Sequence, residues 1–234
     1  GVSRMNTYFN ASAFLSAFPP LLTRLPYTLG IVLESVVLGM FIGILLTCLG
    51  RSRNRLIKMI VTGYVWLMRG TPLLLLLFIS YYALPALLAS LGVDVDSDDP
   101  LVYALIAFAL SLSAFFEEMM RAGFDAVSEG QVQAAKSLSL SRLTYYRRIV
   151  IPQALINCLP NFANLLITAV KQSSILFTIG ITDIYEKAIT LSADDFGLWQ
   201  LEIYVALMLI YWVIAALIDK LISVVYDASL KKVA

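Results

Sequence analysis

Apolar residues in this sequence run in long, nearly uninterrupted stretches, and most charged residues lie between them. A helix needs roughly 20 residues to cross a hydrocarbon core of about 30 Å. Five stretches are long enough, approximately Leu25 to Leu49, Leu56 to Leu91, Leu101 to Met120, Ile151 to Ile179 and Trp199 to Val225. The pattern predicts an all-α integral membrane protein with about five transmembrane helices.

The second stretch is too long for one straight span. It is interrupted at Arg69-Gly70-Thr71-Pro72, where glycine loosens the backbone and proline removes an amide donor. We therefore expect a kinked or two-part helix whose first part lies near the cytosolic interface.

Basic residues between the stretches predict the orientation. The loops after the first and third stretches, together with the C-terminus, hold eleven basic residues, and the other loops hold three, Arg4, Arg24 and Lys187. The eleven are Arg51, Arg53, Arg55, Lys58, Arg121, Lys136, Arg142, Arg147, Arg148, Lys231 and Lys232. The positive-inside rule then places the N-terminus outside and the C-terminus in the cytosol, in agreement with an odd number of spans.

The loops assigned to the outside are acidic. They carry Asp94, Asp96, Asp98 and Asp99 in one, and Glu186, Asp194 and Asp195 in the other. A solvated cap explains these charges better than a binding patch does.

Composition agrees with a membrane protein and narrows its chemistry. Hydrophobic residues make up 60% of the 234 residues and charged residues 14%, with a mean hydropathy of +0.84. Because the sequence has no histidine, imidazole bases, imidazole metal ligands and histidine-activated nucleophiles are excluded. Cys48 and Cys158 lie in apolar runs, so we expect neither a disulfide nor a metal site.

We expect a single transmembrane domain over residues 1–234, with a core from about 25 to 226 and a cytosolic loop from about 121 to 150. Ser128 and Gln131 have the spacing of a capping box, which predicts a short helix from Glu129 to about Leu138. Ser141 is expected to cap a second helix, Arg142 to Ile149, that ends before Pro152. This hairpin presents small and apolar residues to the cytosol, which favours a protein partner.

Several motifs in this order carry a family resemblance. Glu118-Met119-Met120-Arg121-Ala122-Gly123, the run from Gly130 to Ser141, and Ile151-Pro152-Gln153-Ala154-Leu155 resemble the EAA loop of type I ABC importer permeases. The polar amino-acid uptake class matches best. Two further motifs of that class are similar to Arg69-Gly70-Thr71-Pro72-Leu73-Leu74 and to Lys171-Gln172-Ser173-Ser174 with Asn164. The resemblance covers nearly the whole chain from Leu25 onward.

The resemblance implies a permease subunit in the bacterial cytoplasmic membrane. Two permease chains, identical or different, would form the pathway as a dimer that works by alternating access, with two ATPase subunits beneath and an extracytoplasmic substrate-binding protein outside. The sequence has no Walker A loop, so we expect no enzyme activity and no cofactor in this chain, with ATP and Mg²⁺ bound by the partner ATPase.

The same resemblance assigns the cytosolic hairpin as the coupling helix that docks on the ATPase. Its expected contact residues are Gly130, Gln131, Gln133, Ala134, Ala135, Ser139, Leu140 and Arg142. Gln133 stands where the family has glutamate, and Ser139 where it has glycine. Either the docking groove has adapted, or this chain is the weaker-coupling half of a heterodimer.

Polar residues inside the spans are candidates for the substrate pathway, because such residues are costly in lipid. They are Arg69, Thr71, Asn164, Lys171, Gln172, Ser173 and Ser174. Arg69 has two interpretations, a structural tie at the helix break or a clamp for a substrate carboxylate. Lys171 also has two, a buried pair with a carboxylate such as Glu118 or a place on the pathway.

Gln172 bears on the substrate. The resembling permeases frequently have aspartate there, which would suit a cationic side chain, whereas an amide offers donors and an acceptor. With Asn164, Ser173 and Ser174 on or near the same helical face, it favours a polar neutral or dipolar amino acid, such as glutamine or cystine, over a cationic one. Alternatively these residues join helices, as serine and asparagine often do in lipid.

Other residues have structural interpretations. We expect a local pair between Glu118 and Arg121, and a packing face at Gly39 and Gly43. Interface anchors are expected at Tyr81, Tyr82, Trp199 and Tyr204. Two rival functions remain, a self-contained channel or secondary transporter, and a non-transporting half of a heterodimeric permease.

Overall fold

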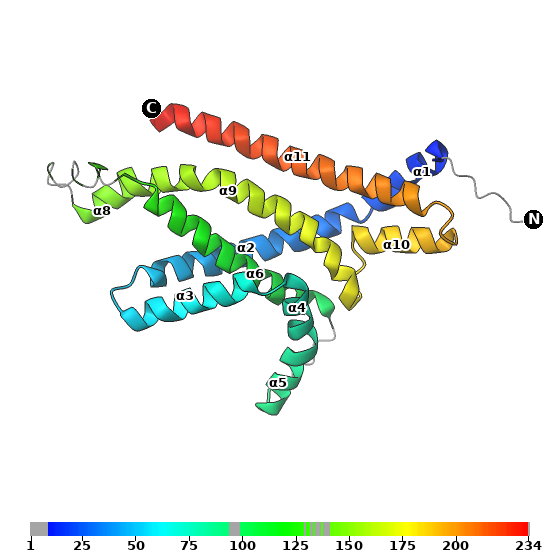
Figure 1. The fold of residues 1–234 in the computed structure, drawn as a ribbon, viewed down its shortest axis with the longest axis horizontal. Coiled ribbons are helices and arrows are strands. Elements are labelled where there is room, and N and C mark those ends of the chain that lie inside the picture. Colours follow the sequence, from blue (N-terminus) through cyan, green and yellow to red (C-terminus); the bar gives the residue numbers. More distant parts are fainter. Residues whose placement is uncertain are drawn as a thin grey trace, which may run out of the picture.

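The computed structural model describes residues 9–93, 99–128, 130–131, 133, 137 and 141–233. Every regular element in this part of the chain is a helix (Figure 1). In order they are α1 (Ala11–Leu22), α2 (Leu25–Gly50), α3 (Arg55–Gly70), α4 (Leu73–Phe78), η1 (Ile79–Ala83), α5 (Leu84–Ser90), α6 (Pro100–Asp125), α8 (Arg142–Tyr145), η2 (Tyr146–Val150), α9 (Ile151–Gln172), η3 (Ser173–Ile179), α10 (Ile184–Asp194) and α11 (Gln200–Val233).

Five helical segments are long and apolar enough to cross a membrane. They are Leu25–Gly50, Leu73–Ser90, Pro100–Asp125, Arg142–Ile179 and Gln200–Lys231. The expected all-α fold and number of spans are therefore confirmed. The break at Thr71 is confirmed too, because Thr71 is extended (φ −97°, ψ 127°) and separates α3 from α4, as the residue before a proline prefers.

The long helices α2, α6, α9 and α11 lie side by side along the long axis of the molecule (Figure 1). The ends of α2, α6 and α11 and the starts of α3 and α8 lie together at the end on the left of Figure 1. We call this the cytosolic end, because the basic loops lie there. α1, α10 and the turn between α10 and α11 lie at the opposite end, which we call the outer end.

α6 forms the centre of the protein, and close packing against α2 holds it there. A Cβ atom added at Gly39 would lie 2.8 Å from Leu112 Cβ, and one at Gly43 would lie 2.7 Å from Phe116 Cβ. Real Cβ atoms do not approach so closely, so only glycine fits at both positions. The expected packing face at these two glycines is confirmed.

The helix that begins at Arg142 does not end before Pro152, so that expectation was wrong. α8 continues through η2 into α9. Pro152 has no amide hydrogen to donate, and the helix widens just before it, since Ile151 N–H donates to the carbonyl of Tyr146, five residues back. The wider turn lets the chain pass the proline without a break.

α1 is a further helix that the hydropathy pattern did not predict. Asn10 caps its start by accepting from the amides of Ser12 and Ala13. The amide of Asn10 donates to Glu202 Oε1 at 2.8 Å, which ties the start of α1 to α11.

Candidate transport site and coupling segment

The outer part of the fourth span borders a cavity shared by several helices. α9 passes into η3, and η3 ends at Gly180, whose φ of 85° is a left-handed conformation that suits glycine. The chain then turns into α10, which packs on α11. A cavity of about 540 Å³ is lined by Ile167, Lys171, Ser174, Tyr185, Tyr204, Leu207, Met208, Tyr211, Trp212 and Ala215.

Lys171 is the one charged side chain among the described residues that line this cavity. It is exposed, and no described carboxylate lies within 4.0 Å of it. Glu118 pairs instead with Arg69 and Arg121. Of the two interpretations of Lys171, the buried pair with Glu118 was therefore wrong, and Lys171 lines the cavity.

Aromatic rings form much of the cavity wall. The rings of Tyr185 and Tyr204 in the lining stack with their centroids 6.3 Å apart, and Phe177, outside the lining, lies 5.2 Å from the Tyr185 ring centroid. Tyr204 lines this cavity, and its role as an anchor at the membrane interface stays a prediction. Sequence reasoning missed Tyr211 and Trp212 as well, because an aromatic residue in an apolar run gives no sign of which face it occupies.

The structure separates the other polar residues of α9 and η3. Ser173 is fully buried and donates to the carbonyl of Val170 at 2.8 Å. Gln172 is half-buried and does not line the cavity. Asn164 lines a different cavity of about 160 Å³ beside α11. Lys171 and Ser174 share one face because they are three residues apart, so the expected grouping of all these residues is not found.

Arg69 forms a structural tie between α3 and α6. Its Nη1 lies 3.1 Å from Glu118 Oε2, and its guanidinium lies 5.8 Å from the ring centroid of Phe115. Arg121 Nη2 lies 2.6 Å from Glu118 Oε1, which confirms the expected local pair. Thr71 donates to the carbonyl of Leu67 at 2.7 Å. Thus Arg69 and Thr71 hold the helix break, away from the Lys171 cavity.

The segment from Gly130 to Arg142, to which the resemblance assigns the coupling role, is called the coupling segment here, and the structure describes part of it. Gly130, Gln131, Gln133 and Ser137 are helical, and Gln133 is exposed. Ala134, Ala135, Ser139 and Leu140 lie outside the described residues. Ser141 caps α8 as expected, because its Oγ accepts from the amide of Thr144 at 3.2 Å, and Arg142 after it is exposed. Gln131 Oε1 accepts from Gln153 Nε2 at 2.8 Å, so the segment contacts the start of α9.

Asp183 holds the start of α10 behind the Lys171 cavity. It is 0% exposed, and its Oδ1 accepts from the amide of Glu186 at 2.9 Å. Its Oδ2 is buried without a hydrogen-bond partner. Burial raises the pKa of Asp183 to about 6, against the opposing effect of the backbone hydrogen bonds.

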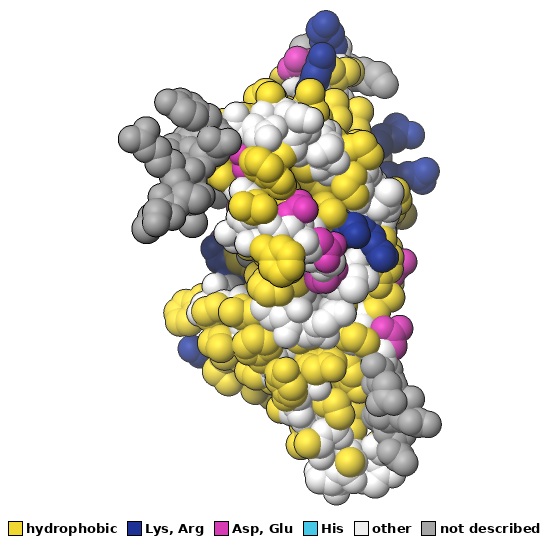
Figure 2. Space-filling model, turned by 90° about the vertical axis from the view of Figure 1, so that its right-hand side faces the viewer, with side chains coloured by type: hydrophobic (Ala, Val, Ile, Leu, Met, Phe, Trp, Pro, Cys, Tyr) yellow, Lys and Arg dark blue, Asp and Glu magenta, His cyan; other side chains and the backbone are white. Residues whose placement is uncertain are grey.

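The outer end carries an exposed aromatic side chain on a strained turn. Figure 2 looks onto this end and shows hydrophobic side chains with acidic and basic ones among them. Phe196, between α10 and α11, is 95% exposed and has a φ of 53°. It is the one residue other than glycine with positive φ in the described ranges. Leu198 beside it is also exposed. This turn therefore presents apolar side chains as well as the acidic residues expected there.

Comparison with known proteins decides the family. Residues 35–232 match the family described as binding-protein-dependent transport system inner membrane component. The chain belongs to this family. It is 34% identical to the L-cystine transport system permease protein TcyL of Bacillus subtilis (strain 168), over 92% of this chain and 89% of that protein. It is also 34% identical to the arginine transport system permease protein ArtQ of the same organism, over 92% and 93% of the two chains.

A solved structure of another transporter supports the same family assignment. A chain in the crystal structure of an amino acid ABC transporter with histidines matches with a TM-score of 0.82 and 28% identity, covering 94% of this chain and 99% of that one. The protein is therefore an ABC importer permease, a multi-pass protein of the bacterial inner membrane. It is a transport subunit, and ATP hydrolysis belongs to a separate subunit.

Proposed function

We propose that this permease carries a polar neutral or dipolar amino acid, such as glutamine or cystine, and that the cavity at Lys171 receives the carboxylate of that substrate. The observation that carries the proposal is the exposed ammonium group of Lys171 in an aromatic-lined cavity, with no described carboxylate to pair with it. Relatives named for cystine, arginine and glutamine transport support an amino-acid substrate.

The charge of the cavity supports a neutral substrate over a cationic one. A guanidinium or second ammonium group would be repelled by Lys171 and would meet no acidic side chain in the described lining. The tyrosine and tryptophan rings would supply contact area to a polar side chain together with hydroxyl and indole hydrogen-bond groups.

Membership of this family supports the remaining parts of the proposed mechanism. The chain would pair with a second permease chain, the same or different, and the pair would open alternately to the two sides of the membrane. Two ATPase subunits would bind ATP and Mg²⁺. The coupling segment around Gln133 and Arg142 would dock on the ATPase, and Phe196 would contact the substrate-binding protein at the outer end.

Uptake by the reconstituted complex tests this function. The permease and its partner subunits are placed in proteoliposomes, and ATP-dependent uptake of labelled glutamine, cystine and arginine is compared. Lys171→Ala is expected to raise KM about tenfold or more, because a charge-assisted contact to the substrate carboxylate is lost. Lys220→Ala, at an exposed lysine of α11, is the control.

Three outcomes would contradict the proposal. Uptake without the ATPase would indicate a channel or secondary transporter. Substrate bound only to the other chain of a heterodimer would indicate a non-transporting half. Equal KM values for Lys171→Ala and the wild type would mean that Lys171 does not contact the substrate.

A further inference from the structure

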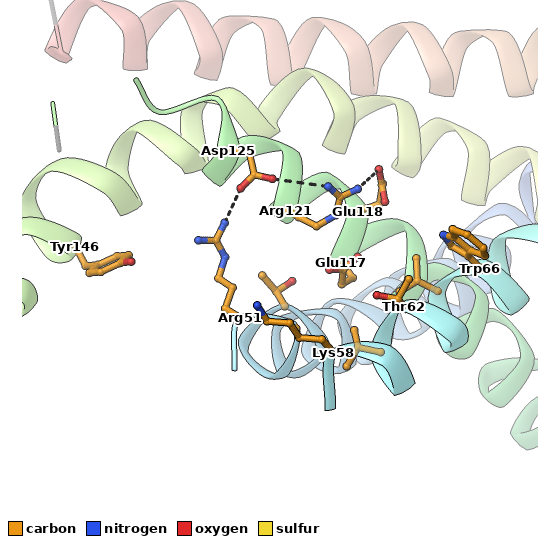
Figure 3. Close-up of a pocket in the computed structure, with 13 residues that line it drawn as sticks. Arg51, Lys58, Thr62, Trp66, Glu117, Glu118, Arg121, Asp125 and Tyr146 are labelled. Carbon is orange, nitrogen blue, oxygen red and sulfur yellow. Dashed lines mark hydrogen bonds and ion pairs between the residues drawn. The ribbon is translucent and has the colours of Figure 1, made fainter. Parts of the chain in front are cut away.

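A second cavity, with different chemistry, lies at the cytosolic end between α2, α3 and α6 (Figure 3). It has a volume of about 600 Å³, and its described lining includes six charged side chains. They are Arg51, Lys58, Glu117, Glu118, Arg121 and Asp125. The proposed transport site uses none of them.

Ion pairs account for four of the six. Arg51 Nη2 lies 3.1 Å from Asp125 Oδ1, and Arg121 Nη2 lies 2.6 Å from Glu118 Oε1. Arg121 also reaches Asp125 Oδ2 at 3.7 Å. Figure 3 shows this chain of contacts along one side of the cavity. Glu117 and Lys58 take part in none of these ion pairs.

Glu117 is a buried carboxylate without a close partner in the described part of the protein. It is 5% exposed, and neither an ion pair within 4.0 Å nor a hydrogen bond joins it to another described side chain. Burying a carboxylate without a direct partner is unfavourable, and the nearby positive charges of Arg121, Arg69 and Arg51 offset that cost only in part. A cationic group entering the cavity would remove that penalty.

Lys58 lines the same cavity from the first turns of α3, and it is exposed. The cavity therefore presents a recessed negative charge and an accessible positive charge that do not neutralise each other directly. A ligand with an ammonium group and an anionic group carries the complementary pair of charges.

We propose that this cavity binds a zwitterion, with the ligand's ammonium group at Glu117 and its anionic group at Lys58. Two sources offer this chemistry. A free amino acid reaches the cavity from the cytosol, and the headgroup of phosphatidylethanolamine reaches it from the membrane, where Trp66 on the rim is 75% exposed. The site is separate from Lys171, so it does not rest on the proposed transport function.

Two binding measurements on the complete transporter distinguish the sources. Both use a Lys171→Ala background, which is expected to weaken binding at the proposed transport cavity. The first measures equilibrium binding of labelled L-glutamine to the complex in nanodiscs made only of phosphatidylglycerol, which has no ammonium group. The second uses native mass spectrometry to compare retention of phosphatidylethanolamine and phosphatidylglycerol by complexes from a mixed membrane.

Glu117→Gln keeps the shape of the side chain and removes its charge. It is expected to weaken zwitterion binding about tenfold or more, since hydrogen bonds to charged groups are the stronger ones. Lys58→Gln is expected to weaken it less, because Lys58 is exposed. Asp227→Asn, at an exposed carboxylate of α11, is the control and should leave binding unchanged. Glu117→Ala, which removes the carboxylate altogether, keeps the test valid if the glutamine variant misfolds.

Glutamine binding that depends on Glu117 would support the site with a cytosolic amino acid as its ligand. Selective retention of phosphatidylethanolamine that depends on Glu117 would support it with a lipid headgroup. The proposal is overturned if neither ligand binds, or if binding is the same in Glu117→Gln, Glu117→Ala and the control.

Discussion

Gln153, at the start of α9, donates from its Nε2 to Oε1 of Gln131 in the coupling segment, at 2.8 Å. α9 is also the helix that carries Lys171. This contact therefore joins the cytosolic segment to the helix that borders the candidate transport site.

We expect this hydrogen bond to transmit movement of the coupling segment to α9. Gln153→Leu should leave the ATPase activity of the complex largely intact and lower the number of substrate molecules transported per ATP, by a few-fold, because one neutral hydrogen bond contributes about 1 kcal/mol. Simultaneous measurement of uptake and ATP hydrolysis in proteoliposomes checks this. Gln200→Leu, at an exposed glutamine of α11, is the control. An unchanged ratio would show that the contact is not needed for coupling.

The contact of α2 with α6 predicts opposite effects for two glycines of the same helix. Gly43→Ala should lower the stability by about 1–3 kcal/mol, because its new Cβ would lie 2.7 Å from Phe116 Cβ. Gly30→Ala should raise it by up to about 1 kcal/mol, because nothing lies within 4 Å of the added Cβ and alanine favours a helix. Thermal unfolding in detergent measures both. Equal effects would contradict close packing at Gly43.

Asp183 predicts a pH-dependent stability. Its pKa is about 6 in the folded protein and about 3.9 in an unfolded chain. Between these values the folded state binds more protons, so the contribution of Asp183 is most favourable at low pH and is lost as the pH rises through 6. Asp183→Asn keeps an oxygen to cap α10 and cannot ionise. It should therefore be more stable than the wild type at pH 7.5, by on the order of 2 kcal/mol.

The difference should shrink below pH 5, where the folded wild type is protonated at Asp183. Unfolding temperatures of both proteins across this range test the sign. A variant that is equally stabilised at every pH would mean that the charge of Asp183 is not the cause. Glu186→Gln, at a half-buried carboxylate of the same helix, serves as the comparison.

A substitution at Phe196 is expected to change the stability of the permease and its binding to the substrate-binding protein in opposite directions. Phe196→Gly should raise the unfolding temperature, because glycine adopts the φ of 53° without the left-handed penalty of about 1–2 kcal/mol. The same change should weaken binding of the substrate-binding protein that supports uptake, since the exposed ring is lost. Phe9→Ala removes another exposed ring near α1 and is the control. Docking that survives in Phe196→Gly would assign the turn a purely structural role.

Part of the candidate site was predictable from the sequence. Lys171 and Ser174 were expected on the pathway, and both line one cavity. The tyrosine side of this cavity was not predicted, since Tyr185 lies on α10 and Tyr204 and Tyr211 lie on α11, and these helices come together only through the turn between them. The ion pair of Arg69 with Glu118 was not expected either, because these residues are 49 positions apart in the chain.

The sequence alone determined that the protein crosses a membrane and about how many times, and it predicts the orientation, because hydropathy and loop charge act over each segment independently of the rest. Only the tertiary structure decided which polar groups meet. Packing of α3 on α6 pairs Arg69 with Glu118, whereas Lys171 lines a cavity bordered by α10 and α11. Packing at Gly43 holds α2 against α6 near Glu117. Such contacts depend on which faces of distant helices come together, and the order of residues along one helix does not contain that information.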